Sequence, residues 1–99
     1  MLIGKLEIEM EMLKRHLLIL KYVIEQEPIG IMKLSELTKL PRHKVRYSLR
    51  VLEHEGLIGP SVHGAVTTAK TRQFVDTLGH RISVLGHRFD EVKKLGSEM

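Results

Sequence analysis

The stretch from Leu40 to Ile58, LPRHKVRYSLRVLEHEGLI, constrains the fold of this chain more than any other part. Val45, Leu49 and Leu52 recur at the three- and four-residue spacing that places side chains on one face of a helix. Basic and polar residues fall on the faces left to solvent, namely Arg42, His43, Lys44, Arg46, Tyr47 and Arg50. The stretch therefore predicts a helix with one packed face and one cationic face.

Signals at both ends of this helix set its limits. Pro41 suits the first helical position, where its missing N–H costs nothing, and Gly56 suits the left-handed residue just past the end. A shorter helix, IMKLSELT, is expected to open after Gly30, with a tight turn at Lys39 between the two helices. Its core-facing positions are Ile31, Leu34 and Leu37. Two short helices joined by about three residues, the second basic and exposed, form a helix-turn-helix unit.

Positive charge is concentrated in this unit. Between Lys33 and Arg50 six lysines and arginines are balanced only by Glu36, whereas the whole chain of 99 residues has a net charge of +4. Such concentration favours a polyanionic partner, because lysines and arginines bind nucleic acid by neutralising phosphates. The sequence thus predicts double-stranded DNA as the partner, with the basic helix in its major groove.

Two longer helices are predicted at residues 5–26 and 68–95, each with an apolar stripe of heptad-like spacing. In the second helix the sequences LGHRI and LGHRF recur seven residues apart, and glycines inside a helix cost about 1 kcal/mol each relative to alanine. Close approach of another helix would offset that cost. A second copy of the chain is the simplest partner, so we expect a homodimer. The predicted interface comprises Leu6, Met10, Leu13, Val75, Leu78, Gly79, Ile82, Leu85, Gly86, Phe89 and Val92.

A short β-hairpin is predicted between these parts, at residues 57–67. Gly59 to Gly64 is dense in turn residues, and the apolar residues on both sides of it can pair as two strands. His63 is the only basic side chain in the hairpin, so a contact with DNA there would be weak. Thr67 is expected to cap the helix that follows.

The middle of the chain resembles the winged helix-turn-helix regulators. Leu34 matches the buried position of their first short helix, Ser35 the small-residue position, and Leu40 the residue that anchors the turn. The run LEHEGLI resembles the "LE-x-x-GLI" pattern with which these proteins leave the recognition helix. One departure is Lys39, where glycine is usual, which implies a cost if its φ is positive.

The layout is also similar to MarR- and ArsR-like proteins and to small archaeal regulators with a winged-helix head and a coiled-coil tail. The resemblance implies a mainly α fold of one domain, residues 1–99, with a small β-hairpin and with terminal helices in a dimer interface. It implies a homodimeric, sequence-specific transcriptional regulator whose recognition helix spans about residues 41–55. The residues expected to contact DNA are Lys33, Lys39, Arg42, His43, Lys44, Arg46, Tyr47, Arg50 and His63.

Three other functions stay open on the sequence. A metal-responsive repressor would use Asp76 with His80, and His87 with Asp90 or Glu91, at the i+3 and i+4 spacing of zinc ligands on a helix. However, the heptad pattern puts these residues on the outer face, so no metal or other cofactor is expected. The second open function is that of a winged helix that binds only protein. The third is that of a non-specific architectural DNA-binding protein.

Catalysis and membrane insertion find no support in the sequence. Cysteine is absent, and neither a nucleophile motif nor a phosphate-binding glycine loop occurs, so no enzymatic activity is expected. No apolar run approaches the roughly 18 residues that a membrane span needs, and no secretory signal pattern follows Met1. We therefore expect a cytoplasmic protein, and the sequence leaves a small-molecule effector unidentified.

Overall fold

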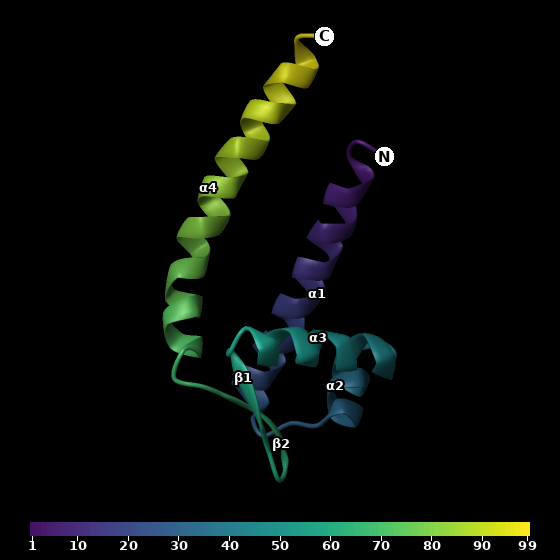
Figure 1. Ribbon diagram of the computed structural model, residues 1–99, viewed down its shortest axis with the longest axis vertical. Helices are drawn as coiled ribbons and strands as arrows, with labels where there is room; N and C mark the ends of the chain where they lie inside the picture. The colour runs from purple at the N-terminus through teal and green to yellow at the C-terminus, as the bar shows by residue number, and fades with distance from the viewer.

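The computed structural model describes residues 1–99, which form four helices and one hairpin. In chain order the elements are α1 (Gly4–Gln26), α2 (Ile31–Thr38), α3 (Arg42–His54), β1 (Ile58–Ser61), β2 (Gly64–Thr67) and α4 (Thr71–Ser97) (Figure 1). The expected mainly helical fold with a small antiparallel hairpin is confirmed. The arrangement is compatible with a winged-helix layout.

The core lies where the C-terminal part of α1 meets α2, α3 and the hairpin. Its buried members come from α1, from the segment after it, from both short helices and from the start of the hairpin: Ile19, Leu20, Val23, Ile29, Leu34, Val45, Leu52, Leu57 and Ile58. Because α1 supplies three of these nine residues, α1 is the element against which the helix-turn-helix pair is fixed.

The turn between α2 and α3 is left-handed at Lys39, with a φ of 62°. Lys39 therefore has the positive φ at which the sequence implied a cost, although a turn of another type was equally open. Two hydroxyl groups support the strained turn: Ser35 Oγ donates to the carbonyl of Leu40, and Thr38 Oγ1 accepts from the Leu40 N–H at 3.3 Å. Pro41 is the N-cap of α3 and not its first helical residue, because its backbone is extended, with a ψ of 151°, and the helix begins at Arg42.

The C-terminal end of α3 is closed by a Schellman motif. Gly56 has a φ of 76°, as the sequence predicted, and its N–H donates to the carbonyl of Glu53 at 3.0 Å. The N–H of Leu57 donates to the carbonyl of Leu52 at 2.9 Å, and both leucine side chains are buried. The glycine thus turns the chain directly from α3 into the hairpin.

The hairpin pairs Ile58 with Thr67 and Ser61 with Gly64 in antiparallel register. A further bridge joins it to the segment after α1, since the backbones of Ile29 and Ala65 exchange two hydrogen bonds of 3.1 and 2.8 Å. This close approach requires a glycine at position 64. A Cβ on Gly64 would lie 2.5 Å from the Ile29 carbonyl, and the φ of Gly64 is 128°.

The prediction that Thr67 caps the last helix is wrong. Thr67 lies in β2, and its N–H and hydroxyl both donate to the carboxylate of Glu27 at 2.9 Å. Helix α4 begins at Thr71, three residues later than predicted, because the Thr71 hydroxyl accepts from the Thr68 N–H and donates to the carbonyl of Leu57. These bonds tie the start of α4 to the hairpin.

Helices α1 and α4 project from this core in the same direction, so that the N and C termini lie at the same end of the molecule (Figure 1). The molecule measures 55 × 28 × 20 Å, and every residue from 81 to 99 is exposed. Its radius of gyration is 15.9 Å, against about 13 Å for a compact domain of this size. Nothing lies within 4 Å of an added Cβ at Gly79 or Gly86 in the single chain, so the approach of a partner helix there stays a prediction.

No helix has a stretch that is both long enough and apolar enough to cross a membrane.

Candidate nucleic-acid interface

The outward face of α3 is the most cationic surface on the helix-turn-helix pair. Val45, Ser48 and Leu52 are buried and hold the opposite face of the helix in the core. This packing leaves a ridge of exposed side chains that spans about two helical turns. The ridge is formed by His43, Arg46, Tyr47 and Arg50. The ridge follows from the 3.6-residue period, because residues 43, 46, 47 and 50 share one side of a helix.

A shallow groove of about 530 Å³ runs along this ridge, and no carboxylate lines it. Its lining consists of Arg15, His43, Lys44, Arg46, Tyr47 and Arg50. Five of these six were predicted to contact DNA. On the other side of the ridge a second shallow groove also includes Arg46 and Arg50 but contains Glu53. The acid-free groove is therefore the better match to a polyanion.

The other predicted DNA contacts lie around this groove and outside it. Arg42 is exposed at the start of α3, Lys33 is exposed on α2, and Lys39 is exposed in the turn between the two helices. His63 is exposed at the tip of the hairpin, next to Val62, which is 95% exposed. The structure thus brings the α3 residues together and leaves His63 on a separate element.

Arg15 was not predicted to belong to this surface. Its guanidinium carbon lies 6.0 Å from the centre of the Tyr47 ring, within the range of a cation–π contact. Its Nε atom is buried and has no hydrogen-bond partner within the protein. An unsatisfied buried donor costs about 1–3 kcal/mol, so the protein alone does not complete the hydrogen bonding of Arg15.

Glu11 precedes Arg15 by four residues on α1, a spacing that allows an ion pair, but the two side chains do not form one. The structure contains two ion pairs, Lys21 with Glu25 and Arg72 with Asp76, and neither involves Arg15. The guanidinium lies over Tyr47 of α3 instead, because α1 and α3 cross at this point. The one signal in the sequence was the basic run Lys14-Arg15-His16, inside a helix whose first half is acidic.

His16 is a second residue that sequence reasoning missed. Its Nδ1 atom lies 2.8 Å from Ser48 Oγ, and its ring centre is 5.8 Å from that of Tyr47. Burial and, to a lesser extent, the positive charge of Arg15 lower the pKa of His16 below its usual value of 6.5. Because Ser48 is fully buried, the pair joins α1 to the inner face of α3 and is not open to a substrate.

The depressed pKa of His16 predicts that stability falls in mild acid. Below pH 6.5 the unfolded chain binds a proton at His16 before the folded protein does, so the free energy of unfolding decreases as pH falls toward the folded-state pKa. Urea unfolding at a series of pH values measures this slope. His16→Gln should flatten it, whereas His87→Gln, which replaces an exposed histidine on α4, should not. Equal slopes in all three proteins would contradict the prediction.

The predicted dimer residues form an apolar surface on the projecting helices. Most of them are exposed in the single chain: Leu6, Met10, Gly79, Ile82, Leu85, Gly86, Phe89 and Val92. Leu13, Val75 and Leu78, which lie nearer the core, are half-buried. Phe89 lines a shallow groove of about 380 Å³ together with Ile3, Leu6 and Met10, so the outer parts of α4 and α1 face each other there.

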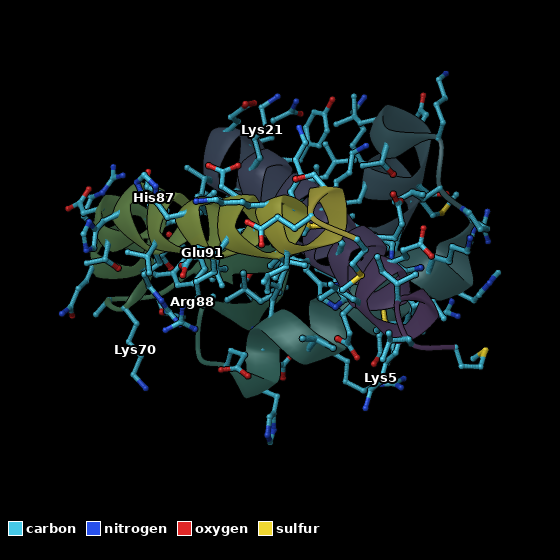
Figure 2. The ribbon with its side chains drawn as sticks, turned by 90° about the horizontal axis from the view of Figure 1, so that it is seen from above. Lys5, Lys21, Lys70, His87, Arg88 and Glu91 are labelled. Atoms are coloured by element: carbon cyan, nitrogen blue, oxygen red, sulfur yellow. The ribbon has the colours of Figure 1, made fainter.

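The residues that a metal-responsive repressor would use do not gather into a site within the chain. No group of three or more histidine, aspartate or glutamate side chains is placed to hold an ion. Asp76 is engaged by Arg72 at 3.2 Å. His87, Arg88 and Glu91 all lie on the exposed part of α4, with Glu91 seen between the other two (Figure 2). The remaining candidates, His80 and Asp90, are exposed as well.

A comparison with protein-family models and with curated proteins finds no match for this chain.

Proposed function

We propose that the protein binds double-stranded DNA as a winged helix-turn-helix transcriptional regulator, with α3 in the major groove. The observation that carries the proposal is the acid-free groove on the outward face of α3, lined by four lysine and arginine side chains and a histidine. A helix that is fixed by its inner face and cationic on its outer face has the shape and charge that the major groove accepts.

The position of each side chain on α3 suggests its role. His43, Arg46 and Tyr47 stand on the ridge of the helix, where they would reach base edges, and an arginine can bind guanine through two hydrogen bonds. Lys44 and Arg42 lie on the flanks of that ridge near the start of the helix and remain candidates for base edges too. Arg50, Lys33 and Lys39 are placed for phosphates, where they would give affinity without sequence preference.

The hairpin is proposed to contribute little. His63 is its one basic side chain, and the serine at the end of β1 is turned back on the loop, where Ser61 Oγ donates to the carbonyl of Gly64 at 2.6 Å. The short helices must therefore provide most of the contact in each subunit.

The test is binding of labelled duplexes to the full chain over a series of salt concentrations. We expect the logarithm of the binding constant to fall linearly with the logarithm of salt, and a duplex selected from a random pool to bind more tightly than the unselected pool. Salt-dependent binding without a preferred duplex would indicate an architectural protein. Failure to bind any duplex would overturn the proposal and favour a winged helix that binds protein.

We further propose that two copies pair through α1 and α4, so that two α3 helices face successive major grooves about 34 Å apart. The apolar residues at heptad spacing on the exposed part of α4 support this pairing, since a contiguous exposed apolar face marks an interaction site. The acidic start of α1 and the lysines late in α4 are also complementary in charge.

Phe89→Glu is expected to convert the dimer into a monomer, because it places a charge in the exposed part of the proposed apolar seam. The matched control is His87→Glu, which introduces the same side chain on the opposite face of the same exposed helix turn and should leave the dimer intact. Sedimentation of both variants and of the wild type measures the outcome. A wild type that sediments as a monomer at all concentrations, or a dimeric Phe89→Glu variant, would contradict this pairing.

A further inference from the structure

Arg15 combines three features that are unusual for an arginine in the middle of a helix. Its Nε–H is buried without an acceptor, no carboxylate pairs with it, and its guanidinium lies over Tyr47 of the neighbouring helix. Buried donors without a partner are rare in folded proteins, and each one calls for an explanation. The structure satisfies every other buried side-chain nitrogen and oxygen, so Arg15 stands alone in this respect.

We propose that Arg15 binds a phosphate of the DNA backbone and so extends the nucleic-acid site from the helix-turn-helix onto α1. This inference rests on the proposed function, because it assigns one more contact to the same duplex. Arginine suits the role, since its planar fork can give two parallel hydrogen bonds to phosphate oxygens, here from the two terminal Nη groups, because Nε is covered by the protein.

The surroundings of Arg15 indicate a phosphate and not a base edge. Arg15 and Lys44 both line the acid-free groove. Both side chains also line a different groove, the α1 groove, which runs along the first half of α1. The arginine is therefore at the flank of the α3 ridge, where the strand backbone would pass when the ridge enters the major groove. Tyr47 lies beneath the guanidinium and limits its movement.

The α1 groove also contains Glu7 and Glu11, which would repel a phosphate. Neither is within ion-pair distance of Arg15, and both precede it by one or two helical turns, toward the start of α1. The acceptable place for a phosphate is therefore the end of this groove where Arg15 and Lys44 meet. The two glutamates would keep the backbone from passing further along α1.

The experiment measures salt dependence of duplex binding for the full-length protein with Arg15→Gln, Arg15→Met and Arg15→Lys. The probes are the selected duplex and the unselected pool. Loss of one phosphate contact lowers the slope of the log–log salt plot by about 0.9, and we expect this reduction with both Gln and Met. Affinity should fall by about tenfold at low salt, equally for the two probes. Arg15→Lys keeps the charge, so it should keep the slope while binding several-fold more weakly.

The matched control is Lys14→Gln, which removes one positive charge from the adjacent exposed residue of the same helix. It should leave the slope at the wild-type value. An equal loss in Lys14→Gln, or an unchanged slope in Arg15→Gln and Arg15→Met, would overturn the inference. Circular dichroism shows whether the two neutral variants fold. If neither folds, Arg15→Lys decides: binding as tight as that of the wild type would overturn the inference, because a lysine cannot reproduce the two-donor contact.

Two further outcomes separate this inference from the proposed function. If the wild type prefers one duplex and Arg15→Gln behaves like the wild type, only the Arg15 contact fails. If the wild type binds no duplex, both fail. Inorganic phosphate at matched ionic strength tests for a free anion: stabilisation of the wild type but not of Arg15→Gln, without any change in the DNA slope, would overturn the assignment to DNA.

Discussion

Arg46→Ala is expected to weaken binding to the selected duplex by about 10- to 100-fold, while binding to the unselected pool falls much less. Arg46 stands on the exposed ridge of α3, in the acid-free groove, and makes no ion pair within the protein. Its removal leaves no buried group unsatisfied, so the fold should be unaffected. The loss would come from the missing contact with a base edge.

Two other arginine variants are compared with Arg46→Ala. Arg50→Ala removes a proposed phosphate contact on the same helix. It should weaken binding to the selected duplex and to the unselected pool equally, and it should lower the slope of the salt plot. Arg72→Ala makes the same replacement on α4, where the arginine is paired with Asp76 outside the groove, and it should bind like the wild type. Titration by fluorescence anisotropy gives all three affinities. Equal loss on both probes for Arg46→Ala would contradict base recognition and indicate an architectural binder.

Leu34→Ala is expected to lower the free energy of unfolding by about 2–5 kcal/mol, the range found for buried leucines replaced by alanine. The Leu34 side chain is fully buried where α2 meets the core, so its removal would leave a cavity between α1, α2 and α3. For a domain of this size each kcal/mol corresponds to roughly 4–8 °C in the midpoint of thermal unfolding.

Met32→Ala is the matched control for Leu34→Ala. Met32 is on the same helix and 67% exposed, so its replacement should change the free energy of unfolding by about 0.5 kcal/mol or less. Both variants are compared with the wild type by urea unfolding at one protein concentration, because dimerisation would make stability depend on concentration. Similar effects of the two substitutions would show that α2 is not anchored by Leu34.

The sequence was informative where the signal is local. The two short helices and the left-handed Gly56 follow from residue types and spacing within a few positions of each other, whereas the left-handed conformation of Lys39 was left open. The exposed face of α3 follows in the same way, since Val45 and Leu52 are buried as their spacing predicted, although Ser48 and not Leu49 is the third buried residue.

Contacts between distant segments were not predictable from the pattern. Arg15 and His16 joined the candidate site only because α1 crosses α3, and the angle of that crossing depends on the packing of side chains such as Ile19 and Val45. Thr67 was expected to cap α4, but Glu27, forty positions away, accepts its hydrogen bonds. The requirement for Gly64 likewise arises from the Ile29 backbone and not from its neighbours in sequence.

The continuity of α1 has a mechanical consequence. This helix runs for 23 residues, with no proline and no glycine after its first residue, from the exposed apolar tip to the core beneath α3. A rod of this kind cannot bend at a defined hinge. In a dimer joined at its tips, the separation of the two α3 helices would be fixed by the lengths of rigid helices. Such a protein would tolerate little variation in the distance between half-sites, and inserting a single base pair between them should sharply reduce binding.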